Sequence, residues 1–574
     1  MSSISCFRPG WIRAAVVAGG AVLPALVAQA GDVPDPGVAP PREFAPPSAR
    51  EAAPPGAVPL APSARHPNAE AGLAMPYAGK PIDVTTYHYD GLRTGWNPRE
   101  TALTRASVKS AKFGLLHRIP VDGDVLAQPL VVSNFAFPDG DRRDVLVVAT
   151  ENNSVYAFDA RNYDRIWHVN LGTPQDSEHV GCLHVHPQYG VSATPVIVRR
   201  ARDRATLYVV SATEPSPHEF RTKLHALDLA DGKARRPAVD IHASKKLNDG
   251  STLEFAPKFN WIRAGMALGP DDSIYLAASS HCDNIGKRTA GWLIRYDTDL
   301  KQIGDFSTID TPAGNKLAAF WASGFAPAVD HAGNLFAVTG NGNFDKGGRD
   351  WGETVLRLPP NLARATDWFT PGDYRKLNGA DLDFGSGGVL LLPMLDGQKA
   401  PPLAVAIGKD NVLYLLNRNN LGKLTADDSG ALQHKRRGPS GTGLWGGTAY
   451  YKGPNGGRVF VQSDDDVLRA YHVDTGSTPS LAEVAAGTQR VMLGGSIPIV
   501  TSDGDKAGTG VVWVLRRHHP PYLDAYDAEH LGAPLFSAEL PDYTGGSPKL
   551  TPIAANGRVY IGTSGSVSVF GLTP

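Results

Sequence analysis

The chain has 574 residues, 42% of them hydrophobic, and a formal net charge of −1 at pH 7. It is long enough to bury a large core, and it carries no basic stripe or block of like charge. This distribution argues against nucleic acid as a partner. The sequence also lacks a C-x-x-C-H motif, so it encodes no covalently attached haem.

The N-terminus has the pattern of an export signal. Arg8 and Arg13 precede an apolar run from Ala14 to Ala28, which ends in Ala-Gln-Ala. A basic region, a short apolar region and small residues at the end predict a secretory signal peptide over residues 1–30, and therefore a periplasmic or secreted protein. An uncleaved anchor is the alternative. The run is short for a membrane span, and no later stretch reaches the ~20 apolar residues that a spanning helix needs, so we expect no transmembrane segment.

Export also decides how the cysteines are interpreted. Cys6 lies within the predicted signal, so Cys182 and Cys282 would be the two cysteines of the mature chain. In an oxidising compartment their default state is one disulfide. By the chain-entropy argument, a bond closing a loop of this span stabilises the fold by on the order of 4–5 kcal/mol.

The next fifty residues, 31–80, are rich in proline interleaved with alanine. Such a segment buries little apolar surface and favours extended conformations, so it is predicted to be a disordered linker. The remainder, residues 81–574, is predicted to form one domain because of the repeats that it contains.

The repeat consists of short β-rich runs separated by Gly, Asp, Asn and Pro turns. Its clearest copy has successive runs at Gln128–Val132, Asp144–Thr150, Ser154–Asp159 and Ile166–Val169. The third run recurs seven more times, at Leu224–Asp228, Leu293–Asp297, Val355–Leu358, Leu413–Asn417, Leu468–Asp474, Leu523–Asp527 and Val567–Phe570. Radial stacking of four-stranded sheets covers both faces of each sheet, so the prediction is an all-β, eight-bladed β-propeller.

Closure of the ring is also predicted. The last unit ends after its third strand, and an unpaired strand, Phe113–Pro120, precedes the first unit. Pairing of these N- and C-terminal strands would complete the eighth blade and cover two exposed sheet edges. Seven blades with a separate N-terminal hairpin is the alternative.

The sequence Ala-Phe-Asp-Ala at 157–160, followed by Trp167, resembles the blade signature of quinoprotein dehydrogenases. Those enzymes are periplasmic eight-bladed propellers that use pyrroloquinoline quinone (PQQ) and usually Ca²⁺. Non-catalytic propellers share the signature, in which the tryptophan locks neighbouring blades together.

A second resemblance lies around Trp321 and Asn341. Phe-Trp-Ala-Ser at 320–323, followed by the Gly-rich stretch 333–341, is similar to the family segment that supplies a tryptophan beneath the quinone and an asparagine ligand to calcium. A flat aromatic ring suits a planar tricyclic cofactor, and an amide oxygen suits a hard cation. A core tryptophan and a turn asparagine are the structural alternative.

The turn Thr-Pro-Gly-Asp at 370–373, followed by Asp381 and Asp383, resembles the family's approach to its catalytic aspartate. The resemblance makes Asp381 the candidate base and a possible calcium ligand, with Asp383 as the second candidate base. A carboxylate near a divalent cation stays ionised and can accept the proton of an alcohol. An Asp-rich loop that caps its own backbone amides is the alternative.

Two further segments resemble pocket-lining parts of the family. Lys409 lies where the family presents a basic residue to the quinone oxygens, and it would stabilise negative charge there. Leu-Trp-Gly-Gly, which contains Trp445, resembles another cofactor-binding segment. For Lys409 the alternative is an exposed turn lysine.

The sequence departs from the family at two places. The enzymes usually carry two adjacent cysteines over the quinone, whereas Cys182 is followed by Leu183. The calcium-binding glutamate of the family would fall near Asp283, a shorter carboxylate, which is therefore the candidate metal ligand here.

A competing cluster is rich in histidine. His179, Cys182, His184 and His186 lie close in sequence, and His281 and Cys282 could join them. Imidazole and thiolate suit zinc or copper, but an oxidised cysteine pair cannot supply thiolates.

The leading hypothesis is an exported, PQQ- and calcium-dependent oxidoreductase that acts on an alcohol, aldehyde or sugar and passes electrons to a separate acceptor. The alternative is a non-catalytic propeller that binds an envelope protein or a polysaccharide. Uptake of the quinone and dye reduction distinguish the two.

Overall fold

A computed structural model describes residues 77–282, 289–311, 318–395, 397–439, 441–492, 494–517, 520–540 and 550–574. The predicted signal peptide, most of the predicted linker and Asp283 lie outside these residues. Among the helices of the described residues, none is both long and apolar enough to cross a membrane.

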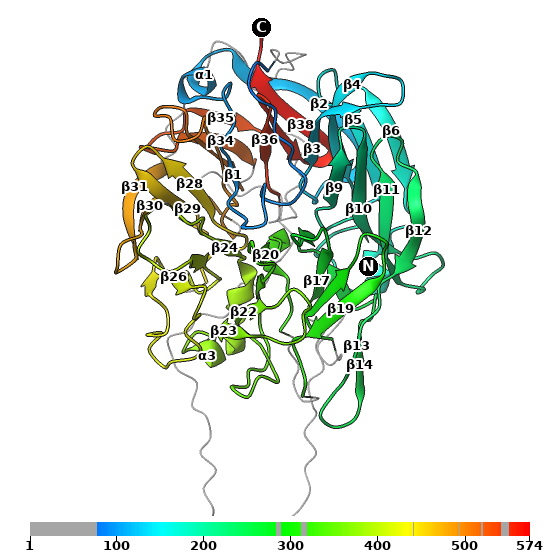
Figure 1. Ribbon diagram of the computed structural model, residues 1–574, viewed down its shortest axis with the longest axis vertical. Helices are drawn as coiled ribbons and strands as arrows, with labels where there is room; N and C mark the ends of the chain where they lie inside the picture. The colour runs from blue at the N-terminus through cyan, green and yellow to red at the C-terminus, as the bar shows by residue number, and fades with distance from the viewer. Residues whose placement is uncertain are drawn as a thin grey trace, which may run out of the picture. The chain divides into compact units, whose positions relative to one another are not determined.

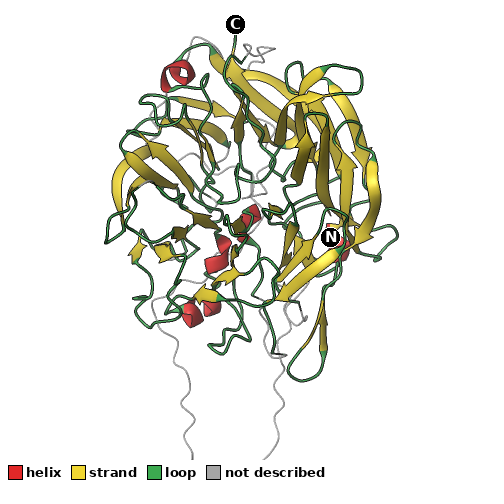
Figure 2. Ribbon diagram, viewed as in Figure 1, coloured by secondary structure: helices red, strands yellow, loops and turns green. Residues whose placement is uncertain are grey.

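Eight antiparallel sheets follow one another along the chain and surround a common centre (Figures 1 and 2). The first four blades contain β3 (Leu130–Ala136), β4 (Arg142–Ala149), β5 (Ser154–Asp159) and β6 (Arg165–Asn170); β9 (Val196–Ala201), β10 (Arg204–Thr213), β11 (Arg221–Asp228) and β12 (Ala234–Asp240); β15 (Asn260–Ile262), β16 (Ala267–Leu268), β17 (Ile274–Ser280), β18 (Trp292–Tyr296) and β19 (Gln302–Ser307); and β20 (Ala328–Val329), β21 (Leu335–Val338), β22 (Val355–Leu358) and β23 (Asp367–Phe369).

The next four blades contain β24 (Val389–Leu391), β25 (Leu403–Ala406), β26 (Val412–Asn417) and β27 (Gln433–Arg436); β28 (Ala449–Gly453), β29 (Gly456–Val461), β30 (Val467–Asp474) and β31 (Ser480–Arg490); β32 (Ile499–Thr501), β33 (Val511–Arg516), β34 (Tyr522–Asp527) and β35 (Phe536–Glu539); and β36 (Ile553–Ala555), β37 (Arg558–Gly562), β38 (Ser564–Leu572) and β2 (Phe113–Asp124). Every predicted third run is the third strand of a blade. The eight-bladed propeller is therefore confirmed.

The elements outside the blades are short. They are β1 (Trp96–Asn97), β7 (Gln175–Asp176), β8 (Gln188–Tyr189), β13 (Ser244–Lys246), β14 (Thr252–Glu254), α1 (Arg105–Lys109), α2 (Ser177–Val180), α3 (Tyr374–Gly379) and the 3₁₀ turns η1 (Ala322–Gly324) and η2 (Phe384–Ser386).

Closure occurs as predicted. Strand β2 pairs antiparallel with β38, with Phe113 opposite Leu572 and Ile119 opposite Val567. Strand β2, which precedes the first blade in the chain, is thus the fourth strand of the last blade. This pairing covers the edges of β2 and β38 that would otherwise lack a partner.

The cores of the propeller lie between the blades. Eight clusters of buried apolar side chains each fill one interface between neighbouring blades, including the interface between the eighth and the first. The signature residue Trp167 contributes to one of them, and its indole N–H donates to the carbonyl of Leu229 on the next blade (2.8 Å). Its blade-locking role is confirmed.

Residues 84–97, which we call the inner ring segment, were not predicted to have a special role. This segment contacts the eight blades in order. In seven of them the contact is to the first strand, through Val84–Val131, Thr85–Ile197, Gly91–Val329, Leu92–Leu391, Thr94–Tyr450, Gly95–Val500 and Asn97–Ala554. In the third blade Tyr87 packs against Gly265, between β15 and β16. The first strands therefore lie innermost, and the segment makes one circuit around the centre of the propeller.

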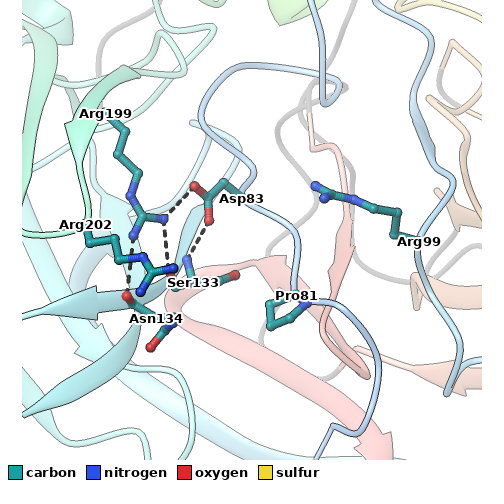
Figure 3. Close-up of a pocket in the computed structure, with 7 residues that line it drawn as sticks. All are labelled: Pro81, Asp83, Arg99, Ser133, Asn134, Arg199 and Arg202. Carbon is teal, nitrogen blue, oxygen red and sulfur yellow. Dashed lines mark hydrogen bonds and ion pairs between the residues drawn. The ribbon is translucent and has the colours of Figure 1, made fainter.

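The start of this segment is anchored beside a surface pocket of about 340 Å³ (Figure 3). Asp83 accepts hydrogen bonds from the backbone N–H of Ser133 (2.8 Å) and from the guanidinium of Arg199 (2.7 Å). These contacts attach the chain to the first two blades at the point where it turns toward the centre.

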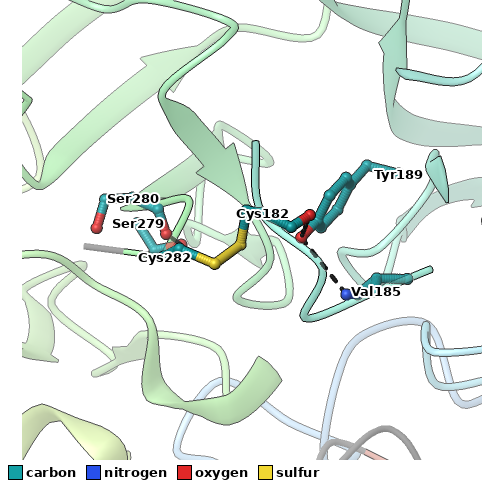
Figure 4. The surroundings of a disulfide bond; sticks show 6 residues. All are labelled: Cys182, Val185, Tyr189, Ser279, Ser280 and Cys282. Carbon is teal, nitrogen blue, oxygen red and sulfur yellow. Dashed lines mark hydrogen bonds between the residues drawn. A yellow bond between two sulfur atoms is a disulfide. The ribbon is translucent and has the colours of Figure 1, made fainter. Parts of the chain in front are cut away.

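The predicted disulfide is present. Cys182, which follows α2, is bonded to Cys282, two residues beyond the end of β17, with a Cα–Cα distance of 5.5 Å (Figure 4). Tyr189 packs beside it and donates its hydroxyl hydrogen to the carbonyl of Cys182 (3.0 Å).

Because the bond closes a loop with a sequence separation of 100 residues, its removal should destabilise the protein mainly through the unfolded chain. The double variant Cys182→Ser/Cys282→Ser is expected to lose on the order of 4–5 kcal/mol of unfolding free energy in urea titrations. An unchanged urea midpoint in the double variant would contradict this expectation.

Candidate functional site

Five separate segments of blades four to six bring the predicted site residues together. Trp321 immediately precedes η1, Asn341 follows β21, and Asp381 and Asp383 lie between α3 and β24. Lys409 occupies the turn between β25 and β26, and Trp445 precedes β28. Residues that are up to 124 positions apart in sequence are therefore direct neighbours in the fold.

Lys409 is at the centre of this group. Its ammonium lies 2.6 Å from Oδ2 of Asp383 and 3.4 Å from Oδ2 of Asp381, and it donates to the Asp381 carbonyl (3.1 Å). The same nitrogen lies 5.2 Å from the ring centroid of Trp321 and 5.5 Å from that of Trp445. Lys409 is only 13% exposed, so it is not the exposed turn lysine of the alternative interpretation.

Asp383 is the buried carboxylate of the pair, with a side chain 4% exposed. Its Oδ1 accepts the backbone N–H of Asn341 (2.8 Å), and its Oδ2 accepts from Lys409. Burial alone would raise the pKa of Asp383, but the charge of Lys409 and hydrogen bonds from Asn341, Lys409 and Trp321 hold it below its ordinary value. Asp383 is thus an ionised anchor for Lys409 and Asn341.

Asp381 differs in exposure. Its side chain is 50% exposed, and its Oδ1 accepts from Nδ2 of Asn341 (2.5 Å). Its backbone has φ of 57°, a left-handed conformation that is uncommon for a residue other than glycine. The fold therefore presents one carboxylate that an external molecule can reach, and a buried second carboxylate that contacts the same lysine and asparagine.

Asn341 has one polar atom left over. Its N–H and Nδ2 are bonded to the two aspartates, whereas its Oδ1 is buried and has no hydrogen-bond partner among the described residues. A buried amide oxygen without a partner is unfavourable in isolation, and it is a suitable ligand for a hard cation.

A row of cations and aromatic rings extends away from Lys409. The guanidinium of Arg263 lies 5.1 Å from the ring centroid of Trp321 and 4.6 Å from that of Trp261. Trp261 stacks on His281, with ring centroids 5.3 Å apart and planes inclined by 7°. Sequence reasoning missed Trp261 and Arg263, which lie in β15 and directly after it, and it considered His281 only as a member of the histidine cluster.

Beneath the site lies Glu353, which is fully buried and was also missed. Its Oε2 accepts the backbone N–H of Phe384 (2.7 Å). Burial raises the pKa of Glu353 well above its ordinary value, and the neighbouring charge of Asp383 raises it further. Glu353 therefore holds its proton to a higher pH than an exposed glutamate does.

Asp410, next to Lys409, is a further buried carboxylate. Its Oδ1 accepts the N–H of Val412 (3.3 Å), and its Oδ2 has no partner among the described residues. Burial, aided by the charges of Asp373 and Asp428, raises the pKa of Asp410 to about 7.

Because folded Asp410 holds its proton more tightly than the unfolded chain, its contribution to stability is complete below pH ~4 and is lost as pH rises to about 7. Asp410→Asn is expected to remove this loss and to be more stable than the parent at pH 8 by on the order of 4 kcal/mol. Urea unfolding at pH 5 and pH 8 measures the effect, with Asp427→Asn, an exposed aspartate, as control. Equal pH dependence in parent and Asp410→Asn would contradict it.

The comparisons with known proteins agree with the fold. No protein-family model matches the chain, and no curated protein matches it in sequence. Among solved structures, its fold is that of the quinoprotein dehydrogenases, as expected from the blade signature. The matches include quinohemoprotein alcohol dehydrogenase from Comamonas testosteroni, with a TM-score of 0.56 and 14% identity over 85% of this chain and 80% of that chain.

Two further structures match at similar levels. Quinohemoprotein alcohol dehydrogenase ADHIIG from Pseudomonas putida HK5 has a TM-score of 0.53 and 14% identity, covering 85% of this chain and 80% of that one. A europium-containing methanol dehydrogenase has a TM-score of 0.54 and 13% identity, covering 86% of this chain and 98% of that one. At these identities the likeness establishes the fold, and the chemistry must be argued from the residues of the site.

Proposed function

We propose that this chain is an exported, PQQ-dependent dehydrogenase that oxidises an alcohol, aldehyde or sugar and passes the electrons to a separate acceptor. The observation that carries the proposal is the half-exposed Asp381 carboxylate, held by Asn341 and Lys409 above the buried Asp383. The predicted signal peptide and the disulfide support a periplasmic or secreted location.

The residues present fit the proposed cofactors. PQQ is a planar, anionic tricyclic quinone, and Trp321 is an aromatic ring with two cations nearby: Lys409 lies 5.2 Å and Arg263 5.1 Å from its centroid. Trp445 lies edge-to-face with Trp321, with ring centroids 6.3 Å apart, and would bound one side of the proposed quinone position. Asn341 Oδ1 and Asp381 supply oxygen ligands for Ca²⁺, and Asp283 is the proposed third ligand.

When bound, the quinone would supply the two-electron acceptor for the substrate carbon. The chain's own residues would perform the proton chemistry. Asp381 would accept the hydroxyl proton, since it is the accessible carboxylate and lies 3.4 Å from the ammonium of Lys409. Lys409 would stabilise negative charge on an oxygen beside Trp321, and Asp383 would hold Lys409 in place.

Reconstitution with PQQ and Ca²⁺ tests the proposal. The purified protein should bind the quinone with a shifted absorbance spectrum and should then reduce an artificial dye when given primary alcohols, aldehydes or sugars. Reconstitution with PQQ in the presence of EDTA and without Ca²⁺ should give no dye reduction. Failure to bind the quinone in the presence of Ca²⁺ would overturn the proposal.

One observation favours the alternative of a non-catalytic propeller that binds an envelope protein or a polysaccharide. Cys182 is bonded to the distant Cys282, and so it does not form the ring of adjacent cysteines expected over the quinone. If the alternative holds, the protein neither binds PQQ nor reduces dye, and Asp381→Asn leaves partner binding unchanged.

A further inference from the structure

A second cluster of potential ligands lies away from the site described above, on the second blade and the loop before it. It consists of His179 in α2 and of Glu214 and His218, which lie between β10 and β11. Each residue offers one ligand atom, and these three atoms all lie within 4.8 Å of one another.

The carboxylate of Glu214 is the buried member and is held rigidly, with a side chain 5% exposed. Its Oε2 accepts the backbone N–H of Asp176 (3.0 Å), and its Oε1 accepts the backbone N–H of His218 (2.6 Å). Asp176 in turn caps the N-terminus of α2 through the amides of Glu178 and His179. The carboxylate of Glu214 is therefore held in a fixed position.

Two imidazoles converge on this carboxylate. Nδ1 of His179 lies 2.6 Å from Oε1 of Glu214, and the rings of His179 and His218 are 4.4 Å apart between centroids. Neither ring nitrogen of His218 hydrogen-bonds a described residue. His218 adopts φ of 66°, so the loop holds it in an unfavourable conformation at the point where its ring meets His179.

We propose that His179, Glu214 and His218 form a binding site for a divalent transition metal such as Zn²⁺. Two imidazoles and one carboxylate are a common ligand set for such ions, with the remaining positions open to water. Ligand atoms around a tetrahedral ion with bonds of ~2.1 Å lie ~3.4 Å apart, so side-chain rotations alone suffice to close the site. Binding would replace the His179–Glu214 hydrogen bond with two metal–ligand bonds and link α2 to the β10–β11 loop.

This site differs from the histidine cluster considered from the sequence. Of that cluster only His179 takes part, while Glu214 and His218 come from the next blade. Cys182, His184 and Cys282 also lie close together, but both sulfurs belong to the disulfide and cannot act as thiolates. The new site is independent of the proposed quinone chemistry, because it shares no residue with it.

Calorimetric titration with ZnCl₂ tests the proposal. The oxidised protein is first stripped of bound metal, and the titration buffer contains excess CaCl₂ and no reductant. One Zn²⁺ should bind per chain, since Ca²⁺ does not compete for imidazole ligands. His218→Ala and, separately, His179→Ala should each weaken binding more than ~100-fold, because even partners outside the ligand shell change metal affinity by about 10–100-fold.

The matched control is His242→Ala, an exposed histidine outside the cluster, which should bind Zn²⁺ like the parent. Circular dichroism tests whether each variant is folded, which is expected for His218→Ala because the ring nitrogens of His218 hydrogen-bond no described residue. Absence of Zn²⁺ binding by the parent, or full binding by His218→Ala, would overturn the proposal. Loss of binding in His184→Ala with retention in His218→Ala would likewise overturn it, by assigning the metal to the residues around the disulfide.

Discussion

Asp381→Asn is expected to lower kcat of the protein reconstituted with PQQ and Ca²⁺ by ~10²–10⁴-fold, the usual contribution of a positioned general base. Asparagine keeps the size of the side chain and an oxygen that can accept from Asn341, but it cannot take a proton from the substrate. Steady-state dye reduction measures kcat, and titration of the quinone absorbance measures cofactor affinity. We expect that affinity to change much less than kcat, because Lys409 remains held by Asp383.

A second variant distinguishes the role of Asp383 from that of Asp381. Asp383→Asn should weaken quinone binding as well as kcat, because Lys409 and the Asn341 amide lose their shared anchor. Asp427→Asn, on an exposed turn, is the control and should match the parent. If Asp381→Asn kept its turnover while Asp383→Asn lost turnover and bound the quinone normally, the assignment of base and anchor would be reversed.

Arg93→Met is expected to destabilise the protein by about 3–5 kcal/mol, because several buried acceptors would lose their donor at once. Arg93 is fully buried in the inner ring segment. Its guanidinium donates to the carbonyls of Pro327 (2.9 Å), Tyr87 (2.7 Å) and Asp90 (3.0 Å) and to the hydroxyl of Thr86 (3.0 Å). Methionine fills much of the volume but satisfies none of these oxygens.

Urea unfolding at pH 7 measures this loss. Arg490→Met is the control, since Arg490 is 66% exposed and its ion pair with Asp465 is solvated, so a change below ~1 kcal/mol is expected. An Arg93→Met midpoint equal to that of the parent would show that the inner ring segment does not stabilise the propeller through this side chain.

Much of the fold could be predicted from local pattern. Alternating apolar residues and turn residues are properties of short segments, so the eight third strands were found with nearly correct bounds. The unpaired strand at Phe113 and the missing strand at the C-terminus also identified the closure, because an open sheet edge needs a partner. The disulfide followed from the two cysteines that remain after the predicted signal.

The site was predicted only in part. Trp321, Asn341, Asp381, Asp383, Lys409 and Trp445 do lie together, and their grouping was suggested by a family resemblance. Their order within the group was not predictable, since which aspartate is buried depends on how the η2 turn packs against β21. Glu353 and Arg263 were missed because a single charged residue beside a strand does not reveal from sequence whether it is buried.

The sequence by itself determined the repeating strands, their number and the closure of the ring, because each of these depends on the hydrophobic pattern of short segments. Only the tertiary structure decided that residues 84–97 circle the centre, that Asp383 rather than Asp381 anchors Lys409, and that His218 meets His179. These three features depend on contacts between polar groups that are distant in the chain. Such contacts leave no periodic signal in the sequence, and their geometry exists only once the blades have assembled.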